Sequence, residues 1–435
     1  MFRFSLCSLL LLLGLAVPAV AQVSVKPYGF VRNYLNFDSR KTYTVIGGEY
    51  NMIPYDELWN EDRSEDLNAV PCVQLQALTT RVGLNIQGPE VLGWQSCGKI
   101  EGDFGGFETK NMVFRIRQAY VKLSCSSETR SSELLVGQAW HPLSGDIMPE
   151  TLGMAAGAPF RPHSRTPQIR ATQEFGLHNS EFKIGYTAAL LYQLQYMNNG
   201  PADASDPTSV ASTNFALNAL WPEAYLGFNF KNNGFLFILG VDAQLLRPRT
   251  HAKIGTVTKK VDERIASVTP TAYVKYQNNK LDIQFRTLLA QNTSHLNQLC
   301  GYAVTGVNED GSWNYAPIRN SISYLNIAYG NKVRCNLFMG LIKNLGAGEE
   351  LHDFSMGGGA YRIYMKGGEN FTQLNSIYRI APSISYNVKA FNIGLEYEWT
   401  ACTYGDLDTH GAVRNNDNLH QVMNHRICAM VKYNF

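Results

Sequence analysis

The sequence predicts an all-β protein: a transmembrane antiparallel β-barrel of about 16 strands with one inward-folded constriction loop. Three observations predict this fold. Segments that alternate between polar and apolar residues recur along the chain, their connections alternate between short and long, and one proline-rich stretch interrupts the series. A period of two is the pattern of a strand with one polar and one apolar face.

The alternating segments are about 9–13 residues long, which is the length that crosses a bilayer as a tilted strand. We count sixteen of them, and single-chain bacterial barrels have an even number of strands. The expected strands lie near 26–37, 76–87, 96–105, 112–123, 132–140, 166–175, 181–196, 222–231, 235–247, 265–277, 281–291, 321–329, 333–343, 376–387, 390–401 and 421–435.

The connections between these segments are sorted by length. Residues 232–234 and 330–332 are minimal hairpin signals, whereas 38–75, 197–221 and 292–320 are long and polar. Outer-membrane barrels have short turns at one end and long loops at the other. A soluble sandwich gives no reason for such sorting, so the connections favour the barrel.

The strand near 112–123 shows which face is expected to meet lipid. Arg115 and Arg117 alternate with Phe114, Ile116 and Tyr120. Arginine at the bilayer midplane costs about 2–4 kcal/mol on the lipid face of a barrel. We therefore expect the two arginines to face the lumen and the three apolar residues to face lipid. The same argument places these basic residues of other strands inward: Arg81, Lys99 and Arg170.

The proline-rich stretch 139–172 joins the fifth and sixth expected strands, on the side of the long loops. It contains five prolines, a density that breaks helices and strands, and its end is basic. Long loops of this kind are usually functional or disordered. We expect residues of about 141–165 to fold into the lumen as a constriction loop that brings Arg161, His163 and Arg165 to the pore.

A sixteen-stranded barrel encloses an aqueous channel, and rings of Arg or Lys favour anions. The predicted pore-lining and constriction residues are Arg81, Lys99, Arg115, Arg117, Arg161, His163, Arg165 and Arg170. An alternative is that these charges pair with acidic residues and merely line water. The acidic residues in question are Glu101, Asp103, Glu174, Glu396 and Glu398.

The two ends of the chain agree with an exported barrel. Residues 1–21 start with Arg3, continue through a short apolar run and close with an Ala-x-Ala site, which predicts a signal peptide cleaved near Ala21. The remainder, 22–435, is expected to be a single barrel domain. Its last segment alternates up to the terminal Phe435, a familiar pattern at the end of outer-membrane barrels.

The composition suits a surface shared between lipid and water. Charged residues make up 17% of the chain, below the roughly 25% of soluble domains, and there are 23 tyrosines and 21 phenylalanines. A net charge of +2 gives no indication of nucleic-acid binding. The cysteines form no C-x-x-C pair, so zinc and redox motifs are not supported. We expect no disulfide framework, with a bridge between neighbouring loops left open, and no metal or cofactor.

The chain shows no strong enzyme signature, such as a Walker A, H-E-x-x-H or G-x-S-x-G motif, so we expect no enzymatic activity. Two alternatives to a general channel stay open: a substrate-specific channel with a tight lumen site, and an outer-membrane barrel enzyme. His141 and His163 flank the expected constriction loop as pore-lining or ordinary loop residues. An acidic run over 56–66 is a solvated face or a site for divalent ions that bridge lipopolysaccharide.

Several short motifs carry a resemblance to a known family. They are Tyr28-Gly29-Phe30-Val31-Arg32-Asn33, Asp38-Ser39-Arg40, Thr80-Arg81-Val82-Gly83-Leu84, Gly98-Lys99-Ile100-Glu101-Gly102-Asp103-Phe104, Arg115-Ile116-Arg117-Gln118-Ala119-Tyr120, Gly137-Gln138-Ala139-Trp140 and Arg165-Thr166-Pro167-Gln168-Ile169-Arg170. Together they resemble the DcaP-like trimeric porins of Gram-negative outer membranes. The motifs cover the first 170 residues, and beyond them only barrel periodicity supports the match.

This resemblance implies sixteen-stranded monomers assembled as trimers that pass small, often anionic solutes by diffusion. Some members carry a helical segment before the first strand, which we do not expect here, so the trimer is the less secure part of the prediction. The expected function is a porin of the cell outer membrane. Its expected partners are small anionic or polar solutes, outer-membrane lipid and lipopolysaccharide, and further copies of the chain.

Overall fold

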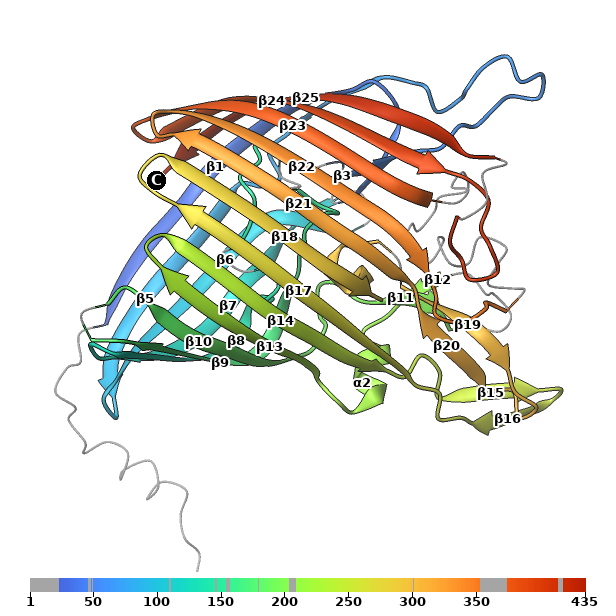
Figure 1. Ribbon diagram of the computed structural model, residues 1–435, viewed down its shortest axis with the longest axis horizontal. Helices are drawn as coiled ribbons and strands as arrows, with labels where there is room; N and C mark the ends of the chain where they lie inside the picture. Colours follow the sequence, from blue (N-terminus) through green and yellow to red (C-terminus); the bar gives the residue numbers. More distant parts are fainter. Residues whose placement is uncertain are drawn as a thin grey trace, which may run out of the picture.

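The computed structural model describes residues 23–435 apart from ten short gaps, and its described part forms a barrel whose larger connections gather at one end (Figure 1). The expected signal peptide over 1–21 lies outside the described residues. The gaps are 46–47, 49, 109–110, 145–146, 154–156, 179, 203–208, 300, 353–373 and 414–417.

The wall of the barrel is antiparallel throughout, and the predicted sixteen-stranded architecture is confirmed. One wall strand is split into two pieces, β4 and β5. The elements of the wall are β1 (Ser24–Asp38), β4 (Cys72–Gln76), β5 (Arg81–Val91), β6 (Trp94–Glu108), β7 (Asn111–Ser126), β8 (Arg130–Trp140), β9 (Arg165–Gly176), β10 (Lys183–Leu191), β13 (Glu223–Asn232), β14 (Phe235–Leu246), β17 (Ile265–Gln277), β18 (Leu281–Gln291), β21 (Arg319–Gly330), β22 (Val333–Gly346), β23 (Leu374–Val388), β24 (Phe391–Tyr404) and β25 (His420–Asn434).

The first strand closes the barrel. On one side β1 pairs with β25, with Val31 opposite Tyr433, and on the other it pairs with both β5 and β4. Phe30 stands opposite Arg81 of β5 and Tyr34 opposite Gln76 of β4. No edge of the main sheet is therefore left unpaired, which a sheet in lipid requires.

The long loops carry small elements of their own at the end of the barrel opposite the tight turns (Figure 1). Within the described residues, no helix is long and apolar enough to cross a bilayer. The loop elements are β2 (Thr42–Val45), β3 (Tyr50–Pro54), β11 (Asn199–Pro201), β12 (Ser209–Ala211), α2 (Asn214–Ala219), β15 (His251–Ile254), β16 (Val257–Lys260), η1 (Ser294–Leu296), β19 (Tyr302–Val307) and β20 (Trp313–Pro317).

Most strands present the faces that their alternation predicts. Ile100, Phe114 and Ile116 are exposed on the outside of the wall, as lipid-facing residues are. Arg115 and Arg117 turn inward, where both contact Asp103 of β6.

The prediction for Tyr120 was wrong. The pairing of β6 with β7 skips a residue, because Glu101 stands opposite Gln118 while Gly102 stands opposite Ile116. This β-bulge reverses the alternation beyond Arg117. Tyr120 consequently stands opposite Lys99, on the inner face rather than beside Phe114 and Ile116. A strict period of two cannot reveal such a bulge.

The six cysteines among the described residues are free thiols, and Cys300 lies outside the described part. Cys402 and Cys428 are buried, whereas Cys72, Cys125 and Cys335 are exposed. Among the described residues, the barrel is stabilised by hydrogen bonds between its strands and by contacts of its loops, without disulfide bonds.

Candidate functional site

The connection between β8 and β9 is residues 141–164, and we call it the lumen loop. Its described residues, 141–144, 147–153 and 157–164, lie inside the barrel. Its backbone carbonyls accept hydrogen bonds from side chains of three wall strands, β1, β21 and β18. Tyr34 donates to Leu152 at 3.0 Å, and Tyr324 donates to Ile147 at 3.1 Å. Arg286 donates to the carbonyl of Leu143. These contacts confirm that the loop folds inward.

Charged side chains of the late strands hold the middle of the lumen loop. Glu396 of β24 accepts hydrogen bonds from the backbone N–H groups of Leu152 (2.8 Å) and Gly153 (3.0 Å). Arg334 of β22 forms an ion pair with Glu150 of the loop. Charge-assisted hydrogen bonds are about twice as strong as neutral ones, so these contacts fix the loop against the wall.

Arg379 of β23 joins two loops to the same wall. Its guanidinium donates to the carbonyl of Ala158 at 2.7 Å and to the carbonyls of Asn51 and Met52, both at 3.0 Å. Glu398 lies 3.4 Å from the Arg379 guanidinium. We call the strands β18 and β21–β24 the anchoring wall, because polar side chains of these strands form hydrogen bonds or ion pairs with the lumen loop.

Two glycines of the anchoring wall allow the lumen loop to approach closely. A Cβ at Gly340 would lie 2.5 Å from the ring of Phe160, and a Cβ at Gly394 would lie 2.5 Å from Leu152. Phe160 is fully buried and also packs edge-to-face on Phe338. The loop thus fits the wall both by hydrogen bonds and by shape.

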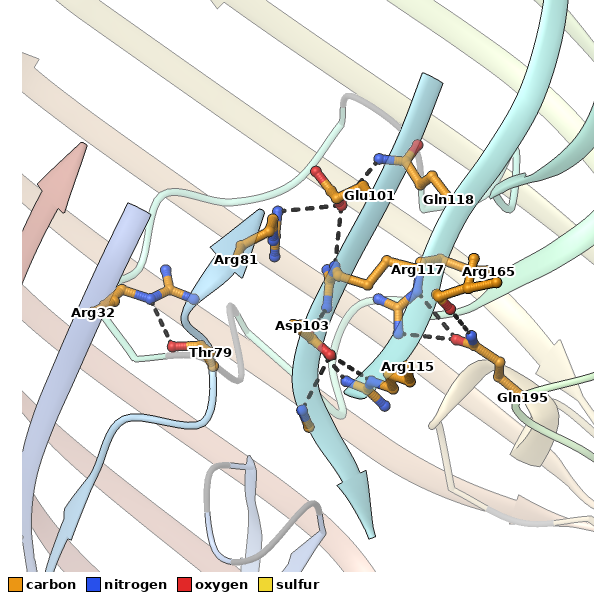
Figure 2. A network of polar contacts seen from close by, with 12 residues as sticks. Arg32, Thr79, Arg81, Glu101, Asp103, Arg115, Arg117, Gln118, Arg165 and Gln195 are labelled. Atoms are coloured by element: carbon orange, nitrogen blue, oxygen red, sulfur yellow. Dashed lines mark hydrogen bonds and ion pairs between the residues drawn. The ribbon is translucent and has the colours of Figure 1, made fainter. Parts of the chain in front are cut away.

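A basic cluster lies on the other side of the lumen, and we call it the arginine wall: Arg32, Arg81, Arg115, Arg117 and Arg165. Figure 2 shows these arginines together with two carboxylates of β6, Glu101 and Asp103.

The two carboxylates pair with three of these arginines. The Arg115 Nε lies 2.7 Å from Asp103, and the Arg117 Nε lies 3.1 Å from Glu101. Arg117 also contacts Asp103, and Arg81 lies 3.6 Å from Glu101. Arg81, Arg115 and Arg117 thus pair with acidic neighbours, as the alternative to a free basic cluster predicts. This pairing does not balance the cluster, because arginines outnumber carboxylates.

The members of the arginine wall differ in their access to water. The side chains of Arg81 and Arg115 are 18% and 17% exposed, whereas that of Arg117 is 1% exposed. Arg165 is buried, stacks on Trp140 at 4.8 Å and donates to Gln195 and Tyr196. Arg117 and Arg165 are therefore buried structural parts of the wall, whereas the guanidinium groups of Arg81 and Arg115 are accessible from the lumen.

Sequence reasoning missed part of this wall. Arg32, Arg81 and Lys432 place their cationic groups 4.9, 5.0 and 4.5 Å from the centre of the Phe30 ring. Arg32 also donates to Thr79, which lies in the break between β4 and β5. The inward alternation of β1 and β25 could have identified Arg32 and Lys432, but only barrel closure brings those two strands to Arg81.

Arg161 and His163 lie near the end of the lumen loop and are buried. Arg161 contacts the Nδ1 of His163 at 2.8 Å, and since a guanidinium only donates, this nitrogen carries no proton. The Nε2 proton then points to the Tyr50 hydroxyl at 2.8 Å. Burial, together with Arg161 and Arg165, holds the pKa of His163 well below its usual value, so the ring is neutral.

The remaining predicted residues lie elsewhere in the lumen. Lys99 places its ammonium 5.2 Å from the Tyr28 ring. Arg170 lines a separate cavity of about 390 Å³, together with Glu174, Lys231 and Ile147 of the lumen loop. His141, at the start of the loop, is buried against Glu223 of β13 rather than facing the arginine wall.

The fold and the inward loop define the class: a sixteen-stranded barrel of the outer-membrane type. Solved structures of this class share the fold. The chain is similar to the outer membrane channel DcaP of Acinetobacter baumannii, with a TM-score of 0.61 and 15% identity over 95% of this chain and 97% of that one. The predicted resemblance to DcaP-like porins is thus confirmed for the fold.

A second similar structure is the trimer form of OmpT, an outer membrane protein of Vibrio cholerae. Its TM-score is 0.51, with 10% identity over 95% of this chain and 99% of that one. No protein-family model and no curated protein sequence matches the chain.

Proposed function

We propose that this protein is an outer-membrane porin through which small hydrophilic solutes, preferably anions, diffuse passively. In this proposal residues 1–21 direct export and are removed near Ala21. The mature barrel sits in outer-membrane lipid and lipopolysaccharide, which its exposed outer residues, such as Ile100 and Phe114, would contact. Assembly as a homotrimer is part of the proposal and is supported by the trimer form of the Vibrio cholerae neighbour.

The observation that carries the anion preference is the charge imbalance of the arginine wall. Arg81, Arg115 and Arg117 pair with two carboxylates. Arg32 and Arg165 add two more cations to the same wall, and Lys432 adds a further one beside Phe30. In a water-filled channel of low-dielectric walls, such an excess raises the local concentration of anions. The planar guanidinium groups also match carboxylate and phosphate oxygens.

A planar-bilayer recording tests the proposal. The purified barrel should give ohmic single-channel steps whose reversal potential in a KCl gradient indicates chloride preference. A panel of anionic, neutral and cationic solutes in a liposome-swelling assay should then rank the anionic solutes first among solutes of one size.

The same recordings separate the alternatives. Saturable block by one class of ligand would indicate a substrate-specific channel with a tight lumen site. A barrel that gives no current but hydrolyses lipid or peptide would contradict the proposal and restore the enzyme alternative.

A further inference from the structure

A second cluster of ionisable groups lies at the root of the lumen loop, away from the arginine wall. It joins His141 at the start of that loop, His295 of η1, Glu223 of β13 and Asp242 of β14. Two loops and the β13–β14 hairpin thus meet at one point. One donor atom of each residue lies within 4.8 Å of the donor atoms of the others.

All four side chains are buried, and their polar atoms are poorly satisfied. The Nε2 atoms of both histidines approach the same Glu223 oxygen, at 2.8 and 3.0 Å. Glu223 Oε2, Asp242 Oδ1 and His295 Nδ1 have no hydrogen-bond partner among the described residues. Buried polar atoms without partners cost about 1–3 kcal/mol each, and such atoms call for an explanation such as a bound ion.

The charge of the cluster is also unbalanced. If both carboxylates are ionised and both imidazoles are neutral, as binding of a metal ion requires, Glu223 and Asp242 leave two buried negative charges, whereas each carboxylate of the arginine wall has an arginine within ion-pair distance. A divalent cation would balance these charges and accept the unshared lone pairs at the same time.

The spacing of the donor atoms suits such an ion. Ligands about 2.0–2.2 Å from zinc stand about 3.4 Å apart at the corners of a tetrahedron. The donor atoms here are separated by 2.8 Å (His141 to Glu223), 3.0 Å (His295 to Glu223) and 3.6 Å (His141 to Asp242). Mixed imidazole and carboxylate ligands favour zinc and similar transition metals over calcium or magnesium.

The four positions are not equivalent. The Leu143 N–H donates to His141 Nδ1 at 3.1 Å, which places the proton of a neutral ring on Nε2, the atom that faces the cluster. His141 can bind a metal through Nε2 only if this contact opens. In His295, by contrast, Nδ1 accepts no bond and can carry the proton, which leaves Nε2 available as a ligand.

We propose that His295, Glu223 and Asp242 form a site for a divalent transition metal of the zinc type, with His141 as a weaker fourth ligand. The ion would join the root of the lumen loop to the loop that carries η1 and to the wall strands β13 and β14. This inference does not depend on the proposed anion preference.

Metal titration of the refolded, detergent-solubilised barrel tests the site. The accessible cysteines are first alkylated, so that they cannot bind zinc. The wild-type protein should bind one zinc ion per chain tightly, and zinc should raise its melting temperature. The variants His295→Ala and Glu223→Gln should bind zinc about 100-fold more weakly, and His141→Ala about tenfold more weakly.

A double variant of two exposed histidines, His178→Ala with His251→Ala, is the matched control and should bind as the wild type does. Heat-modifiable migration on gels verifies that each variant is folded. If a ligand variant does not fold, the visible spectrum of the cobalt-loaded wild type decides, because four-coordinate cobalt absorbs far more strongly than the hydrated ion. The absence of tight zinc binding by the wild type, equal binding by a folded Glu223→Gln, or a hydrated-ion spectrum would overturn the site.

Discussion

The anchoring wall and the arginine wall use the same residue type for different purposes. Arg379 is buried on the anchoring wall, and three of its hydrogen bonds go to loop carbonyls. Arg117 is equally buried on the arginine wall, and its partners are two carboxylates. Arg81 is part of the same wall but keeps contact with water. The number of arginines inside a barrel therefore says little about selectivity until the partner of each one is known.

The largest difference between the two walls should appear in the free energy of unfolding when one arginine is replaced in each wall. Arg379→Gln leaves the carbonyls of Ala158, Asn51 and Met52 without their donor, and we expect the free energy of unfolding to fall by about 3–5 kcal/mol. Arg81→Gln, at a partly exposed position, should cost about 1 kcal/mol or less. Urea unfolding in lipid vesicles, followed by tryptophan fluorescence, measures both. Equal losses would contradict the distinction between the walls.

Displacing the lumen loop without removing a charge should have the next largest effect. Gly340→Val drives a Cβ to within 2.5 Å of the Phe160 ring, an overpacking that costs about 1–3 kcal/mol unless the loop moves away. We expect a larger single-channel conductance as the loop leaves the anchoring wall. Gly98→Val is the control, because its Cβ has no neighbour closer than 3.6 Å. An unchanged conductance in Gly340→Val would show that the loop does not narrow the pore.

The smallest effect concerns His163, which burial beside Arg161 and Arg165 keeps neutral. In the unfolded chain this imidazole titrates near about 6.5. As the pH falls below that value, the unfolded chain binds a proton that the folded barrel does not. The wild type should therefore lose stability relative to His163→Gln, with a slope that approaches about 1.4 kcal/mol per pH unit. Parallel stability curves for the two proteins between pH 7 and pH 5 would contradict the neutral assignment.

The sequence predicted the barrel well because the signal is repeated in every strand. Sixteen alternating segments and the sorting of their connections were sufficient for the fold, and the prolines of the lumen loop identified a connection that turns inward. The inward contacts of the connection after β1, where Asn51 and Met52 meet Arg379, were not predicted. Tyr120 was misplaced because a bulge of one residue leaves no mark on a period of two.

The parts of the site that the sequence did not predict depend on barrel closure or on backbone partners. Arg379 and Arg286 donate to carbonyls of the lumen loop, and a carbonyl has no signature in the sequence. Lys432 reaches Phe30 only because the last strand pairs with the first. The cluster around Glu223 and His295 combines residues from two wall strands and two loops, at spacings that no linear motif describes.

The measurement that tests the central claim most directly is the reversal potential of a variant that lacks three partly exposed cations of the pore wall: Arg32→Gln, Arg81→Gln and Lys432→Gln. The matched control removes the same number of charges from exposed turns, with Lys280→Gln, Lys332→Gln and Lys389→Gln. In a KCl gradient the wild type and the control should prefer chloride, while the wall variant should move clearly toward potassium. A wall variant that keeps the reversal potential of the wild type would contradict the assignment of anion preference to the arginine wall.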